Sequence, residues 1–170
     1  MTPRKLIPFL MFQKGDALEA MEFYTSLFDD GAIEFVERFG EGEPGAGTIR
    51  QGIITVAGQQ IQCMDSPVSH AFDFTPSVSL FIRCESEEEQ QRVWAALSEG
   101  GSQLMPFGDY GFGPFGWCND RFGVSWQVVP TRLAAWMTSG DPAARDRAFT
   151  AMLGMQKLDL AALEAAFAGG

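Results

Sequence analysis

Apolar and polar residues follow one another in a pattern that predicts the same order of elements twice along the chain. Apolar positions recur at helical spacing over residues 17–28 and again over residues 87–97. Around these two helices, apolar or alternating stretches bounded by turn residues predict eight strands, at residues 6–12, 33–39, 48–56, 60–64, 77–84, 102–107, 115–119 and 124–129. The order strand, helix, strand, strand, strand therefore occurs in each half.

The two halves also agree in detail. Gln62 lies four residues after Gly58, and Gln127 lies four residues after Gly123. We therefore predict an α+β protein in which residues 1–130 form a duplicated βαβββ domain. Its repeats span about residues 5–65 and 76–130, and residues 65–76 link them. Residues 131–170 are predicted as a C-terminal helical extension.

Local signals mark where helices and turns begin. Residues 16–19 and 86–89 match the capping box, so both are expected to start a helix. In the extension, residues 133–137 are predicted as a short helix, Asp141 with Pro142 is expected to begin a helix over 143–153, and Asp159 to cap one over 160–167. Residues 120–123 are expected to form a turn whose charged side chains are solvated.

Charge and composition narrow the classes of partner. The 170 residues carry 22 acidic and 12 basic side chains, a net charge of −10, so we expect no nucleic-acid partner and no binding to anionic membrane surfaces. The apolar run at residues 6–12 is short and contains Pro8, which favours a buried strand over a signal peptide. Three scattered Cys without a C-x-x-C pair predict no disulfide framework and a cytoplasmic location.

Four segments are similar to one known family. They are residues 7–12, 20–24, 120–130 and 151–159, and together with the duplicated plan they resemble the PhnB-like branch of the vicinal-oxygen-chelate superfamily. That superfamily includes glyoxalase I, bleomycin- and fosfomycin-resistance proteins and extradiol dioxygenases. The resemblance covers nearly the whole chain and implies paired modules that cup a small-molecule cavity, commonly in a homodimer.

This branch also carries the family name 3-demethylubiquinone-9 3-methyltransferase. A methyltransferase that uses S-adenosylmethionine would usually show a Gly-rich loop after a strand in an alternating βαβ pattern. The sequence has no segment in that context. We therefore do not expect methyl transfer from this chain.

Strand alternation predicts which side chains face the cavity, because the face that packs on the helices should be the more uniformly apolar one. In the first strand, Leu6, Pro8, Leu10 and Phe12 should pack on the helices, as should Val78 in the repeat. The predicted ligand-binding residues are Phe9, Met11, Gln60, Gln62, Ser77, Ser79, Phe81, Ser125 and Gln127. Trp117 joins them from the Gly-rich and aromatic loop 108–117, which forms either a rim over the cavity or a hairpin that seals the sheet end.

Metal-dependent members of the superfamily take their ligands from these strands. By resemblance, the corresponding positions here are Ile7 or Pro8, Gln62, Ser77 or Val78, and Gln127. Carboxamides and hydroxyls alone do not offset the dehydration of a divalent ion, so we expect no metal and no cofactor. The two Gln side chains then either hold a polar ligand or bind each other or water.

Three functions stay open on the sequence. The first is a metal-independent protein that binds a small apolar or aromatic molecule, by sequestration or as an accessory factor. The second is an enzyme of the same superfamily, a lyase, isomerase or thiol transferase. It would bind a metal through residues other than those assigned above, or it would use the single histidine, His70, as general base. A surface histidine is more often inert. The third is an interaction module that uses the helical extension.

Overall fold

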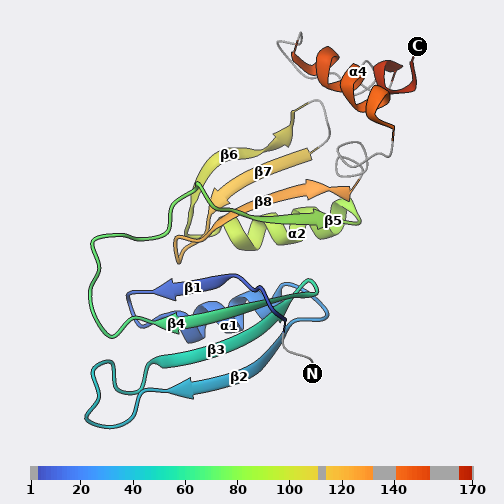
Figure 1. Ribbon diagram of the computed structural model, residues 1–170. Coiled ribbons are helices and arrows are strands. Elements are labelled where there is room, and N and C mark those ends of the chain that lie inside the picture. The colour runs from blue at the N-terminus through green and yellow to red at the C-terminus, as the bar shows by residue number, and fades with distance from the viewer. Residues whose placement is uncertain (1–3, 111–113, 132–140, 154–164, 170) are drawn as a thin grey trace. The chain divides into compact units, whose positions relative to one another are not determined.

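The computed structural model describes residues 4–110, 114–131, 141–153 and 165–169, and it divides the chain into two compact units, Met1–Phe74 and Thr75–Gly170 (Figure 1). Each unit holds one four-stranded sheet. The division falls inside the segment 65–76, where the sequence predicts a linker. No helix in the described ranges is long and apolar enough to cross a membrane.

The first unit follows the predicted order of elements. It contains β1 (Phe9–Phe12), α1 (Ala17–Ser26), β2 (Ala32–Arg38), β3 (Ile49–Val56) and β4 (Gln59–Asp65). The strands lie in the order β1-β4-β3-β2, with β1 parallel to β4 and the other pairs antiparallel. A two-residue turn at Ala57 and Gly58, both with positive φ, joins β3 to β4 as predicted.

The second unit repeats this arrangement. It contains β5 (Leu80–Cys84), α2 (Glu87–Ser98), β6 (Ser102–Asp109), β7 (Pro114–Asn119) and β8 (Ser125–Pro130), in the sheet order β5-β8-β7-β6. Again the first strand runs parallel to the last. A further helix, α4 (Pro142–Leu153), begins as predicted, because Asp141 Oδ1 accepts hydrogen bonds from the N–H groups of Ala143 and Ala144. The helix expected over 133–137 and the Asp159 cap lie outside the described residues.

The duplication extends to the way that each helix packs on its sheet. Helix α1 buries Ala17, Ala20, Met21 and Tyr24, and α2 buries Gln90, Val93, Trp94 and Leu97, at the same spacing. A glycine lies beneath the large side chain in both cases: Gly52 of β3 under Met21, and Gly116 of β7 under Trp94. A side chain at either glycine would collide with the helix, so these two positions set how closely helix and sheet approach.

The two helices begin differently, although the sequence predicts a capping box for both. At α2 the expected cap forms, because Ser86 Oγ accepts from the Glu89 N–H at 3.1 Å; the Glu89 carboxylate reaches back one residue farther than in a capping box and accepts from the Glu85 N–H at 2.7 Å. At α1 the prediction is wrong, because the Asp16 side chain makes no capping hydrogen bond. Asp65, the last residue of β4, takes that role through a hydrogen bond from the Ala17 N–H.

Two expectations about strand ends are also wrong. The repeat strand begins at Leu80 and not at Ser77, since a turn at residues 76–78 precedes it. Ser77 shares a 2.6 Å hydrogen bond with Thr75, and such local side-chain bonds compete with strand pairing. Val78 consequently lies outside the strand. The first strand begins at Phe9 and not at Leu6, so Leu6 and Val78 are both exposed to solvent and do not pack behind the sheets.

Candidate functional site

A row of four side chains crosses each sheet on the face opposite its helix. The strand register aligns Phe35, Ile53, Gln62 and Phe9 in the first unit. It aligns Met105, Trp117, Gln127 and Phe81 in the second. We call these the Gln62 row and the Gln127 row. In both, a glutamine on the fourth strand of the unit pairs with a phenylalanine on the first, so the rows occupy equivalent positions in the two repeats.

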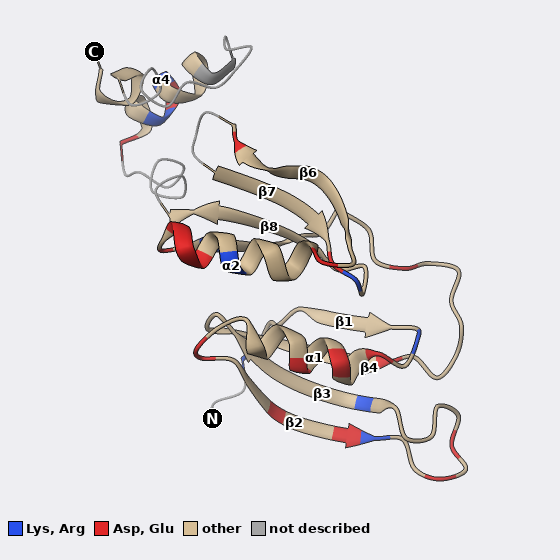
Figure 2. Ribbon diagram, turned by 180° about the vertical axis from the view of Figure 1, so that it is seen from behind, with Lys and Arg blue, Asp and Glu red and all other residues tan. Residues whose placement is uncertain are grey.

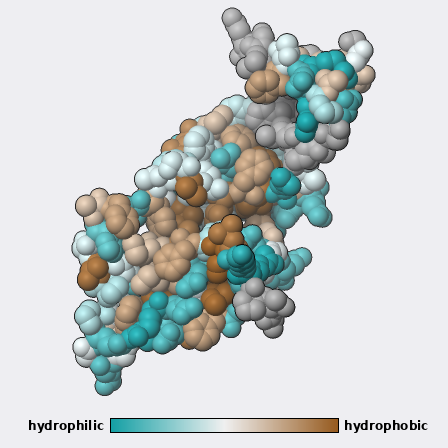
Figure 3. All heavy atoms as spheres, viewed as in Figure 1, coloured by the Kyte–Doolittle hydropathy of each residue, from teal (hydrophilic) through white to brown (hydrophobic). Residues whose placement is uncertain are grey.

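Both rows are open to solvent in the described structure. Phe9 is 51% exposed and Phe81 44% exposed, whereas the next residues along the strands, Leu10 and Ile82, are buried toward the helices. Figure 3 shows apolar side chains, in brown, reaching the surface. Apolar rings left in water make each row a candidate binding surface for an apolar molecule.

The carboxamides of Gln62 and Gln127 are the polar groups of these rows. Both side chains are half-buried. Within its own unit, neither side chain makes a hydrogen bond to another described residue. Each amide therefore offers one acceptor and two donors at the centre of an apolar row, which suits recognition of a ligand with a polar group.

The other predicted ligand residues of the first unit lie beside the Gln62 row. Met11 pairs in register with Met64 of β4. Gln60 Nε2 donates to Glu34 Oε2 at 2.9 Å, and Thr55 donates to the same carboxylate. Gln60 is thus held by Glu34, a residue that the sequence analysis missed and that sits at an irregularity between β2 and β3.

In the second unit, hydrogen bonds connect three of the predicted residues. Ser125 Oγ accepts from Trp117 Nε1 at 2.9 Å and shares a 3.1 Å hydrogen bond with Ser79 Oγ. Ser125 is only 2% exposed. It therefore orients the Trp117 ring through this hydrogen bond and does not itself contact solvent. Trp117 lies within β7 and not in a loop. Ser77 lies apart from this cluster, in the turn before β5.

The turn at residues 120–123 differs from the expectation that its charges are solvated. Asp120 is buried, with hydrogen bonds from the Phe122 and Val124 N–H groups and from Trp126 Nε1 at 2.8 Å. Three donors converge on this carboxylate, which compensates for its burial. Arg121 remains exposed, with its guanidinium over the Phe122 ring.

His70, the candidate general base, lies in the segment that follows β4. Its Nε2 is 2.9 Å from Ser66 Oγ, its backbone N–H donates to Gln13 Oε1, and its ring stacks on Phe72. Gln13 also donates to the Phe72 carbonyl, so one side chain ties the end of β1 to this segment. These contacts hold His70 in place in this segment, and among the described residues no carboxylate is hydrogen-bonded to the ring.

The three cysteines lack the character of nucleophiles. All are free and buried, and burial raises the pKa of each thiol to about 12, with a smaller effect of nearby carboxylates. A thiol with that pKa is protonated at neutral pH and reacts slowly.

The metal-ligand positions suggested by resemblance do not fit a divalent ion. Ile7 and Pro8 precede β1, and Ser77 and Val78 precede β5. The strand residues that face Gln62 and Gln127 are phenylalanines, which have no donor atom. Among the described residues, no group of three or more His, Cys, Asp or Glu side chains could hold a metal ion.

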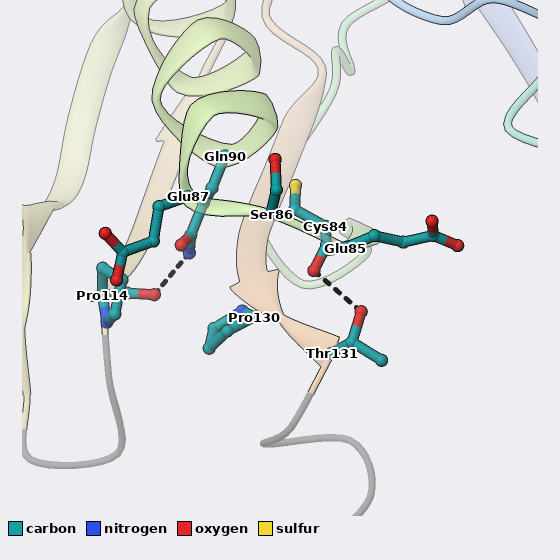
Figure 4. A pocket seen from close by; sticks show the side chains of 8 residues that line it. All are labelled: Cys84, Glu85, Ser86, Glu87, Gln90, Pro114, Pro130 and Thr131. Atoms are coloured by element: carbon teal, nitrogen blue, oxygen red, sulfur yellow. Dashed lines mark hydrogen bonds between the residues drawn. The ribbon is translucent and has the colours of Figure 1, made fainter.

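A hollow of about 340 Å³ lies at the start of α2, which the sequence analysis did not anticipate (Figure 4). Gln90 donates to the Pro114 carbonyl, Thr131 donates to the Cys84 carbonyl, and Ser86 caps α2. These polar groups already form hydrogen bonds within the second unit. Figure 2 shows acidic residues at this helix start, which stabilise the helix dipole. We assign no ligand to the hollow.

Comparisons with known proteins agree with this geometry. The family model of 3-demethylubiquinone-9 3-methyltransferase matches residues 4–129. A PhnB protein from Bacillus cereus is 48% identical, with a TM-score of 0.72, over 75% of this chain and 99% of that one. A protein from Pseudomonas aeruginosa is 29% identical, with a TM-score of 0.64, over 75% and 98%. No curated protein matches the chain.

A more distant structure shares the fold. A glyoxylase/bleomycin resistance protein/dioxygenase domain from Frankia is 14% identical, with a TM-score of 0.53, over 76% of this chain and 92% of that one. The predicted fold class, tandem βαβββ modules with a helical tail, is confirmed by these matches and by the two four-stranded sheets.

Proposed function

We propose that this chain, which belongs to the 3-demethylubiquinone-9 3-methyltransferase family of the vicinal-oxygen-chelate superfamily, binds a small, largely apolar or aromatic molecule without a metal ion. It would act by sequestration or as an accessory factor. The observation that carries the proposal is the repeated row, in which one glutamine stands among exposed apolar side chains in each unit. Homodimer formation, a cytoplasmic location and the absence of a nucleic-acid partner stay predictions that accompany it.

The chemistry of the rows supports binding more than metal catalysis. Covering the half-exposed ring of Phe9 or Phe81 contributes about 1 kcal/mol, and a hydrogen bond to a carboxamide adds about 1 kcal/mol. A glutamine orients a ligand well but is a weak general acid or base, since its amide does not titrate near neutral pH.

The family name describes a methyl transfer that this proposal does not adopt. The described strands form mixed sheets with one parallel pair each, and the first strand of each unit leads into its helix through a short segment without a Gly-rich loop.

Purified full-length protein provides the test. Native mass spectrometry with a metal assay should find no stoichiometric metal. The neutral dye N-phenyl-1-naphthylamine should bind with enhanced fluorescence. Gln62→Leu and Gln127→Leu should each weaken this binding about fivefold, the loss of one net hydrogen bond. Gln91→Leu, on the exposed side of α2, is the matched control and should bind as the unchanged protein does.

Two results would overturn the proposal. One is stoichiometric nickel, zinc, manganese or iron in the purified protein. The other is dye binding that neither glutamine change affects while both variants keep their thermal stability, because the rows would then not be the binding surface.

A further inference from the structure

The two rows are equivalent in register, but the faces around them differ in charge. Two residues beyond the row phenylalanine, the first unit has Met11 and the second has Arg83. Met11 pairs with Met64, and Arg83 pairs with Val129 of β8. The repeat therefore places a cation beside the Gln127 row where the Gln62 row has a thioether.

Arg83 lies on the face of its sheet opposite the helix, beside its buried strand partner Val129. Its neighbours along β5, Ile82 and Cys84, are buried on the helix side, and Arg83 is exposed. Among the described residues, no carboxylate forms an ion pair with its guanidinium, in contrast to Arg50 of the first unit, which pairs with Glu43. Glu85, the nearest acidic residue along the chain, lies beyond the end of β5.

Arg83 and Gln127 are close enough to engage one ligand. Residues two apart on a strand are about 6.6 Å apart, and neighbouring strands lie about 4.8 Å apart, so their Cα atoms are separated by about 8 Å. Phe81 pairs with Gln127 and is the neighbour of Arg83 on this face of β5. Trp117 pairs with Gln127 from the other side, and its hydrogen bond to Ser125 holds the indole toward the end of β8 that is farther from Arg83. A guanidinium, a carboxamide and a phenyl ring thus lie together, and the indole extends the apolar surface beyond Gln127.

We propose that the Gln127 row selects planar aromatic anions, carboxylates or sulfonates, with Arg83 binding the acidic group and the rings of Phe81 and Trp117 covering the aromatic part. The inference rests on the proposed function and names its ligand class. A guanidinium binds a carboxylate or sulfonate through two parallel N–H donors.

Because the chain as a whole is negatively charged, Arg83 should attract an anion only at short range. A net charge of −10 repels anions at long range, but salt at 0.1 M screens charges beyond about 10 Å. Attraction by Arg83 then acts only on an anion that is already seated on the face. We accordingly expect anion preference to weaken as salt concentration rises.

Two dyes with the same ring system provide the test on the full chain: 8-anilino-1-naphthalenesulfonate is an anion, and N-phenyl-1-naphthylamine is neutral. Arg83→Gln should weaken binding of the sulfonate dye about fivefold and leave the neutral dye within about twofold, as expected for a solvent-accessible ion pair. Arg83→Lys should recover part of the loss. Arg121→Gln removes a charge at a turn outside the row and should change neither dye.

The outcomes separate the two proposals. If Phe81→Ala weakens both dyes but Arg83→Gln changes neither, or changes both equally, the anion preference is refuted and the binding surface stands. If neither dye binds the unchanged protein, or Phe81→Ala affects neither, the proposed function fails for this face and the inference fails with it. A sulfonate-specific loss in Arg83→Gln alone supports both.

Discussion

Replacing Gly116 with alanine tests the packing that the duplication predicts, with Gly52→Ala as the matched change in the other unit. A Cβ at Gly116 would collide with the ring of Trp94, where Cε3 and Cζ3 are the nearest atoms. A Cβ at Gly52 would lie 2.5 Å from Met21 Sδ and 2.6 Å from Cε. Both approaches are too close, so in each variant the neighbouring side chain must move.

The magnitudes differ because the neighbours differ in flexibility. Trp94 is 8% exposed and its ring stacks on Phe107, so relief requires a shift of α2. Such overpacking costs about 1–3 kcal/mol, of which the lower chain entropy of alanine returns about 0.5–1 kcal/mol. We expect Gly116→Ala to lower the free energy of unfolding by about 1–2 kcal/mol. The unbranched Met21 can change rotamer, so Gly52→Ala should cost about 1 kcal/mol or less.

Urea unfolding of the full chain, monitored by tryptophan fluorescence and circular dichroism, measures the free energy of unfolding of both variants. If the units unfold in separate transitions, the Gly116 variant should shift one of them and the Gly52 variant the other. In a Trp94→Leu background the penalty at Gly116 should shrink, because the colliding ring is gone. Equal losses for the two glycine variants, or an unchanged penalty without Trp94, would refute the reasoning.

Two further predictions concern buried polar groups. Asp65→Ala leaves the Ala17 and Ile49 N–H groups without their acceptor, so in urea titrations it should lower the free energy of unfolding by about 3–5 kcal/mol. Asp65→Asn should lower it by about half as much. A loss below about 1 kcal/mol for Asp65→Ala would contradict this role. Iodoacetamide at pH 8 should alkylate the native protein slowly and the urea-unfolded protein completely, because burial raises the pKa of all three thiols to about 12. Mass spectrometry that finds one cysteine labelled at the rate of a free thiol would contradict it.

The sequence predicts the duplicated fold well because both of its signals are local. Alternation along a strand decides which side chains share a face, and it assigns Phe9, Gln62, Phe81 and Gln127 correctly to the faces opposite the helices. It does not give the register between strands, which depends on contacts distant in sequence. The match of each glutamine to a phenylalanine therefore appears only in the structure.

The errors at two acidic residues share a physical cause. Asp65 and Asp120 stand beside turns, where acidic residues are usually solvated, yet both are buried because N–H donors from other segments converge on them. No local pattern signals such convergence. The late start of β5 could have been predicted from the sequence. Pro76 lies just before the predicted strand, and proline disfavours strand pairing because it has no N–H to donate. Arg83 could have been found by extending the alternation from Phe81.

Strand β2 has a consequence for how the first unit behaves in concentrated solution. It is the edge of its sheet, is exposed along its whole length, and carries apolar side chains, which would make a flat strand prone to pair with another molecule. Two register shifts interrupt it, and Glu34, Glu37 and Arg38 place charges at those irregularities. A second chain could extend the ladder only by straightening the shifts and burying the charges, so this edge resists aggregation while the apolar rows stay available to ligands.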